Sequence, residues 1–156
     1  MRNAVVLFTL ASFFAVPAAA DQLTGHPRVV DGDTLAFRDA RVRLNGIDAP
    51  ETHQLCQDRA GKSYQCGVAS AAALTGEIGG ALVRCEGEHL DRYGRLIATC
   101  WKGAEDLNAW MVTQGWAVAY RHYSTVYVPQ EDVARATRAG IWAGSFEPPW
   151  DWRRQH

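Results

Sequence analysis

Hydrophobic and polar positions alternate along three short runs near the start of the chain, which predicts β-strands with one buried face. Arg28-Val29-Val30 leads into an Asp-Gly turn, and Thr34-Leu35-Ala36-Phe37 follows that turn. After a second turn, Arg41-Val42-Arg43-Leu44 places its valine and leucine on the core face. Asn45-Gly46 then interrupts the alternation, which we interpret as a bulge that redirects the residues after it. The pattern predicts a three-stranded meander.

Apolar residues recur at helical spacing in three later segments, and a hairpin lies between the first two. The expected helices cover residues 71–78, residues 107–111 and the segment from Pro129 to Gly140, and the expected hairpin strands cover residues 81–85 and 95–101. Glycine follows each helix. The third helix has acidic side chains in its first turn and arginines near its end, as the helix dipole favours.

This order of elements is typical of a small five-stranded barrel of the OB type with three helices, so we predict a mainly β protein of the α+β class. One such domain would cover residues 21–156 and act as a monomer. It ends in an aromatic tail, which we expect to pack as a flap rather than to form a ligand platform. The rings of that tail belong to Trp142, Phe146, Trp150 and Trp152.

The first 20 residues have the features of a signal peptide. Arg2 supplies a positive end, residues 4–16 form an apolar stretch, and Val16-Pro17-Ala18-Ala19-Ala20 resembles a cleavage site. The apolar stretch is shorter than a membrane span. We therefore expect an exported protein, periplasmic or secreted, that begins near Asp21 and keeps no membrane anchor after cleavage.

The charge balance does not identify a partner. Removing the first 20 of 156 residues takes one arginine from the 16 basic side chains and leaves all 17 acidic ones, so the net charge of the remainder is −2. A polybasic nucleic-acid binder, whose affinity rests on many phosphate contacts, is disfavoured. A nuclease needs only a local positive site and stays open.

Four cysteines in an exported chain predict two disulfides. Cys56 and Cys66 enclose a polar loop, and Cys85 and Cys100 lie in the two strands of the expected hairpin. We favour the pairs 56–66 and 85–100 over the other two pairings because both close locally. A zinc site is the alternative, but the spacings differ from paired Cys-x-x-Cys ligands, and the five histidines show no paired ligand spacing either.

Two acidic turns lie beside arginine-bearing strands. Asp33 belongs to the first turn, Asp48 to the second, and Glu51 follows three residues later. Each acid taken singly is typical of an ordinary turn. Carboxylates that converge repel one another unless a hard cation such as Ca²⁺ or Mg²⁺ neutralises them. Arg43 or Arg95, aimed at the same place, would suit a phosphate, so the pattern indicates a metal-dependent phosphodiesterase.

Together, five ordered segments resemble the thermonuclease family, the staphylococcal-nuclease-like domains. The resemblance runs from about Val29 to Trp142. Each segment alone is a weak signal, whereas the ordered set is specific. The segments are Val30-Asp31-Gly32-Asp33-Thr34, Arg43-Leu44 leading into Ile47-Asp48-Ala49-Pro50-Glu51, Asp91-Arg92-Tyr93-Gly94-Arg95, Asp106-Leu107-Asn108 and Gly115-Trp116-Ala117.

The resemblance implies an OB-fold nuclease that depends on Ca²⁺, cleaves DNA and RNA with little sequence preference and leaves 3′-phosphate ends. By the same resemblance, Asp33 and Asp48 bind the ion, together with the backbone carbonyl of Ala49. Residues matching Arg43 and Arg95 bind the scissile phosphate. Glu51 is then the general base that takes a proton from the attacking water.

The resemblance also implies that Arg92, Tyr93 and Tyr120 contact the neighbouring phosphate or base. Two positions depart from the best-known members. Ala49 replaces a threonine, which leaves a carbonyl ligand intact, and Arg92 replaces a lysine, which keeps the charge but changes its geometry. Two alternatives remain: a non-catalytic nucleic-acid-binding module on the same barrel, and an exported interaction domain that binds Ca²⁺ only for stability.

Overall fold

The computed structural model describes residues 21–156, and the predicted signal peptide lies outside these residues. The predicted meander is present as β2 (Arg28–Asp31), β3 (Thr34–Ala36) and β4 (Arg41–Leu44). The predicted hairpin is present as β8 (Val83–Leu90) and β9 (Leu96–Lys102). A parallel pairing of β4 with β9 joins the two parts, so the sheet curls into the OB-like half-barrel that the sequence predicts.

Further strands within residues 21–156 add to this framework. The main sheet has the order β1-β8-β9-β4-β3-β2, with β10 added beside β9. Two small antiparallel pairs lie outside it, β5 with β11 and β6 with β7. The additional strands are β1 (Asp21–Gly25), β5 (Ile47–Asp48), β6 (Leu55–Gln57), β7 (Ser63–Gln65), β10 (Glu105–Asp106) and β11 (Val118–Ala119).

Four α-helices and one short 3₁₀-helix complete residues 21–156. The three predicted helices are present as α1 (Cys66–Ile78), α2 (Leu107–Thr113) and α3 (Val128–Thr137). The tail adds the 3₁₀-helix η1 (Gly140–Ala143) and α4 (Pro149–Gln155), a helix that the sequence reasoning did not predict. None of these helices combines the length and apolar character of a membrane span.

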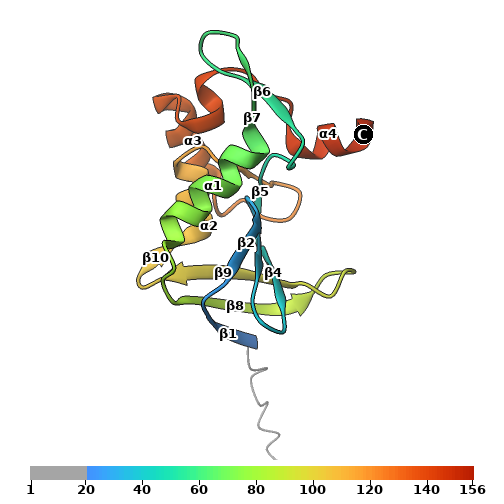
Figure 1. The fold of residues 1–156 in the computed structure, drawn as a ribbon, viewed down its shortest axis with the longest axis vertical. Helices are drawn as coiled ribbons and strands as arrows, with labels where there is room; N and C mark the ends of the chain where they lie inside the picture. Colours follow the sequence, from blue (N-terminus) through green and yellow to red (C-terminus); the bar gives the residue numbers. More distant parts are fainter. Residues whose placement is uncertain (1–20) are drawn as a thin grey trace, which may run out of the picture.

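The helices lie on one side and one end of the sheet. In Figure 1, α1 runs beside β2, while α3, α4 and the β6–β7 hairpin lie at the end opposite β1. The main core lies between the curled sheet and helices α1 and α2, and its fully buried side chains include Leu35, Leu44, Leu74, Leu107 and Met111. The core therefore forms a rigid support beneath the turns that carry the predicted acids.

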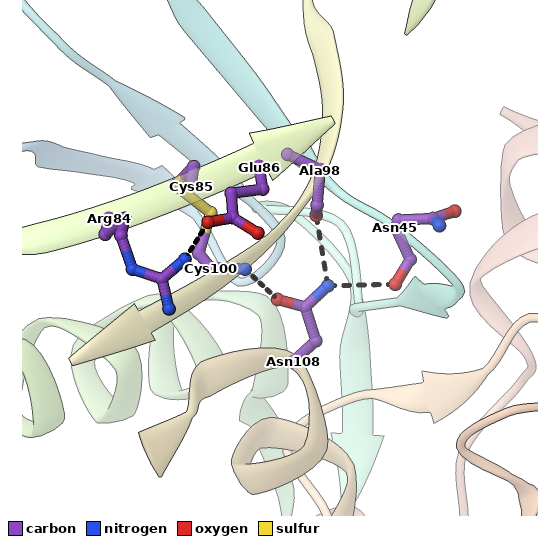
Figure 2. Close-up of a disulfide and its surroundings, with 7 residues drawn as sticks. All are labelled: Asn45, Arg84, Cys85, Glu86, Ala98, Cys100 and Asn108. Carbon is purple, nitrogen blue, oxygen red and sulfur yellow. Dashed lines mark hydrogen bonds and ion pairs between the residues drawn. A yellow bond between two sulfur atoms is a disulfide. The ribbon is translucent and has the colours of Figure 1, made fainter. Parts of the chain in front are cut away.

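The amide of Asn108 connects helix α2 to the sheet (Figure 2). Its Oδ1 accepts a hydrogen bond from the backbone N–H of Cys100 at 3.1 Å. Its Nδ2 donates to the backbone carbonyls of Asn45 and Ala98, at 2.9 and 3.2 Å. The side chain is completely buried, so these bonds replace those that water would make. Asn108 thereby fixes the chain immediately before β5.

The segment Asn45-Gly46 forms a tight turn between β4 and β5, so the prediction of a bulge at this point is wrong. Gly46 has a φ of 73°, a conformation that suits glycine. The turn is fastened from outside because the backbone N–H of Tyr120 donates to the carbonyl of Gly46 at 2.9 Å. The redirection that we attributed to a bulge is therefore made by a turn.

Both predicted disulfides are confirmed. Cys85 and Cys100 face each other across β8 and β9 (Figure 2). Cys56 and Cys66 connect β6 to the start of α1 and belong to a second apolar cluster, which the tail covers with Trp142, Phe146 and Trp150. The predicted packing of the aromatic tail against the body is thus present at these rings.

Candidate active site

The predicted site residues come together around one cavity of about 590 Å³. The meander, the β8–β9 turn and the segments after β5 and β11 contribute its walls. Asp48 lies beneath the cavity with no exposed surface. The predicted residues that line it are Asp33, Arg43, Ala49, Glu51, Arg92, Tyr93, Arg95 and Tyr120.

Asp33 and Asp48 are joined by one guanidinium group. Nη1 of Arg43 lies 2.9 Å from Oδ2 of Asp33, and Nη2 lies 2.9 Å from Oδ1 of Asp48. Asp33 also accepts hydrogen bonds from the backbone N–H of Ala49 at 2.8 Å and from the hydroxyl of Thr34 at 3.2 Å. These bonds orient the Asp33 carboxylate, while Arg43 holds the two acids at a common centre.

The C-terminal helix places a second guanidinium on the same acids. Arg153 of α4 approaches Asp48 in bidentate geometry, with distances of 3.0 Å from Nη1 to Oδ1 and 2.8 Å from Nη2 to Oδ2. Its Nη1 also lies 2.6 Å from Oε1 of Glu51. Arg153 therefore bridges a predicted metal ligand and the predicted general base. The sequence reasoning did not identify this residue.

Arg95 reaches the cavity from the other side. Its Nε donates to Oδ2 of Asp91 at 2.8 Å, and its Nη1 donates to the hydroxyl of Thr34 at 3.4 Å. Burial alone would raise the pKa of Asp91, but the hydrogen bonds from the backbone and side chain of Arg95, and from the backbone of Tyr93, lower it below its usual 3.8. The ionised Asp91 therefore orients Arg95 toward the acids.

The predicted base-contacting residues lie at the rim. Arg92 and Tyr93 are exposed in the β8–β9 turn, and Nη2 of Arg92 donates to the Tyr93 hydroxyl at 2.6 Å. Tyr120 is half-buried after β11, and its ring is stacked on that of Trp150, with centroids 5.3 Å apart and planes 5° from parallel. Tyr120 thus shares one ring face with the tail.

Backbone packing sets the position of Glu51. The start of α1 lies so close that a Cβ atom added at Gly67 would be 1.8 Å from the Glu51 carbonyl oxygen. The backbone N–H of Glu51 donates to Oε1 of the fully buried Gln54 at 3.1 Å, and Nε2 of Gln54 donates to the carbonyl of Glu147 at 2.7 Å. The side chain of Glu51 is 35% exposed, so water can reach it.

Two carboxyl groups of the site, those of Asp48 and Asp31, have raised pKa values. Burial raises the pKa of Asp48 to about 6. The hydrogen bond from Arg153 and the charge of Arg43 lower this pKa, whereas the nearby charge of Asp33 raises it further. Burial and the charge of Asp33 likewise raise the pKa of Asp31 to about 6. Both shifts indicate that a further positive charge would stabilise the ionised carboxylates.

These residues fit a hard divalent cation that is also bound by water molecules and a phosphate. Residues 21–156 contain no group of three or more His, Cys, Asp or Glu side chains placed to hold a metal ion. Asp33 and Asp48 supply two carboxylates, and one or two carboxylates suffice when waters and a phosphate complete the shell. The cavity lining within residues 21–156 offers carboxylate and carbonyl oxygens, the donors that hard cations prefer.

One sequence signal could have revealed α4 and hence Arg153. Pro148-Pro149 places a proline at the first helical position, Asp151 follows in the first turn, and two arginines lie in the last turn. That combination is typical of a short helix. Nothing in the sequence, however, indicates that this helix would lie over a site formed more than 100 residues earlier.

Comparison with known proteins shows what the chain is similar to. The protein-family model described as "Staphylococcal nuclease homologue" matches residues 41–144. "Micrococcal nuclease" of Shigella flexneri is 34% identical over 90% of this chain and 85% of its own length. An "Uncharacterized endonuclease" of Haemophilus influenzae is 33% identical over 99% and 88%. "Succinoglycan biosynthesis protein ExoI" of Rhizobium meliloti is 39% identical over 83% and 69%.

Proposed function

The chain belongs to the staphylococcal nuclease family, whose match supports nuclease activity in general, and we propose that it is an exported, Ca²⁺-dependent nuclease of DNA and RNA. We further propose little sequence specificity and 3′-phosphate products. One observation carries the proposal: Arg43 joins Asp33 to Asp48 at 2.9 Å on each side, in a cavity that also contains Glu51 and Arg95. The residues that we propose as metal ligands, general base and phosphate-binding arginines thus lie together.

The acids would hold the ion, and the arginines would hold the substrate. In this proposal the carboxylates of Asp33 and Asp48, with the carbonyl of Ala49, bind Ca²⁺. The ion would supply positive charge for a phosphoryl oxygen and acidify a bound water. Arg43 and Arg95 would donate hydrogen bonds to two phosphoryl oxygens, where negative charge grows in the transition state.

Glu51 would take the proton of the attacking water. Its carboxylate is partly exposed and lies beside Asp48 through their common partner Arg153. The water oxygen would form a bond to phosphorus while the bond to the 5′-oxygen breaks in line. The 5′-oxygen leaves as a hydroxyl after protonation by solvent, and the phosphate stays on the 3′ end.

Arg153 gives this proposal a specific requirement. Its guanidinium covers both oxygens of Asp48, one of the two carboxylates that would bind Ca²⁺. The side chain is 36% exposed, and in this proposal its guanidinium would swing outward when Ca²⁺ binds, while the stacking of Trp150 on Tyr120 would keep α4 in place. Binding of Ca²⁺ therefore competes with an internal cation for Asp48.

Cleavage assays with and without metal test the function. We expect the purified protein to cut plasmid DNA and RNA with Ca²⁺, to lose activity with a chelator, and to leave 3′-phosphates in end analysis. Asp48→Asn should lower turnover by orders of magnitude, whereas Asp39→Asn, an exposed turn acid, should not. No cleavage with any divalent ion would favour the binding module, and cleavage that survives chelation would refute the metal requirement.

Residue variants test the assigned roles. Glu51→Gln and Arg95→Ala should each reduce turnover strongly while the melting temperature stays near that of the parent protein. Loss of folding in either variant would show that the residue is structural instead.

A further inference from the structure

A second cavity of about 670 Å³ lies beside the candidate site. We call it the tail pocket, because Trp142, Phe146 and Trp150 of the C-terminal tail line it together with residues of α3 and the β11–α3 segment. Tyr120 and Tyr123 line both cavities. A nucleic-acid strand bound at the candidate site could therefore extend past these two rings into the tail pocket.

Aromatic rings form the walls of the tail pocket. Trp142 and Phe146 meet edge to face with centroids 4.8 Å apart, and Trp150 stacks on Tyr120. Flat rings that line a cavity suit a nucleobase, which can stack on them.

The tail pocket also carries excess positive charge. Arg121 and Arg135 both pair with the buried carboxylate of Glu131, at 2.5 and 3.4 Å. The Glu131 carboxylate thus faces two guanidinium groups. A third guanidinium, that of Arg154, lies at the rim of the pocket and pairs with Asp151. Arg135 lies over the Trp142 ring, 4.3 Å from its centroid. Cations beside aromatic rings are the combination that binds phosphate and base together.

We propose that the tail pocket binds one nucleotide of a single strand whose neighbouring phosphodiester lies in the candidate site. The inference rests on the proposed nuclease function and adds a substrate-length preference to it. The base would stack against the tail rings, and its phosphate would approach Arg135 and Arg154. Stacking accepts any base, so the pocket would select strand length and single-strandedness rather than sequence. A paired base is already stacked within its duplex and cannot enter.

Short substrates test this directly. We would measure kcat/KM with Ca²⁺ for a dinucleotide and for two trinucleotides, extended by one residue at the 5′ or at the 3′ end. One extension should raise kcat/KM about 5- to 150-fold, the range expected for one stacked base. Arg135→Gln and Trp142→Phe should each reduce that gain at least about threefold and leave dinucleotide cleavage unchanged.

Arg38→Gln is the matched control, because Arg38 is exposed in the turn between β3 and β4 and its loss changes the net charge equally. Its length gain should equal that of the parent protein. The tail pocket is refuted if neither extension helps, or if the gain persists unchanged in both folded pocket variants, as checked by melting temperature. Absence of cleavage of every substrate would instead refute the proposed function, and the pocket proposal with it.

Discussion

Replacing Arg153 with alanine should have two opposite effects on the protein. Without metal, Asp48 would lose both hydrogen bonds from α4, although it is completely buried, and Glu51 would lose its ion pair. With metal, the same loss removes one of the two guanidinium groups that compete for Asp48, while Arg43 keeps its contact at 2.9 Å. We therefore expect a less stable metal-free protein that binds Ca²⁺ more tightly.

The magnitude follows from the geometry. Hydrogen bonds to charged groups contribute about 1.5–3 kcal/mol, and the 36% exposure of the Arg153 side chain places this case at or below the lower end. A change of about 1.4 kcal/mol corresponds to a tenfold change in the dissociation constant. We expect the Ca²⁺ affinity of Arg153→Ala to rise roughly tenfold, and the metal-free melting temperature to fall by about 3–6 °C.

Calorimetric titration with Ca²⁺ alone provides the assay, because it does not depend on turnover. Arg154→Ala is the matched control, since Arg154 is the next residue of α4, is 74% exposed and pairs with Asp151 instead of the site. Its Ca²⁺ affinity should stay unchanged. Weaker Ca²⁺ binding by Arg153→Ala would refute the reasoning, because it would show that Arg153 supports the metal site and does not compete for it.

Three further predictions concern the support of the site. Gly67→Ala should lower turnover at least about tenfold, because the new methyl group would displace the Glu51 backbone, whereas Gly76→Ala in the same helix meets open space and should stabilise the fold by about 0.5–1 kcal/mol in thermal unfolding. Asn108→Ala should lower the unfolding free energy by about 2–4 kcal/mol in urea titration, because buried backbone groups lose partners; a loss under 1 kcal/mol would contradict this. The lowered pKa of Asp91 means that its carboxylate stabilises the fold above pH 3.8 and stops doing so as the pH falls through the folded-state pKa, so the melting-temperature difference from Asp91→Asn should vanish in strong acid.

The sequence predicted how the central half of the candidate site is arranged, because the residues of that half are close together in the chain. Asp33 lies in the turn just before β3, and Arg43 lies on β4, which pairs with β3 so that Arg43 is opposite Thr34. Alternation and one turn therefore determine which side each residue faces. Asp48 follows within a few residues, and both disulfides close over short loops. In each case a short stretch of sequence contains the physical cause.

The rest depended on contacts that no local pattern encodes. Strands of two residues, such as β5 and β11, form only because they pair with each other. Two residues are too few to show the alternation of apolar and polar side chains that marks a strand. Helix α4 lacks an apolar stripe long enough to predict, and its position depends on Trp150 finding Tyr120. Arg153 reaches Asp48 only after all these elements have packed.

The parallel pairing of β4 with β9 has a consequence for how the protein becomes active. Arg43 lies within β4 and Arg95 immediately precedes β9, so their strands become neighbours only when residues about fifty positions apart in the chain pair. The meander and the hairpin are local and can form earlier, whereas a pairing of such long range closes late. A newly made chain would thus hold Arg43 in a folded meander and Arg95 in a folded hairpin and still lack an assembled site. The rate at which activity returns during refolding would then report the rate at which β4 pairs with β9.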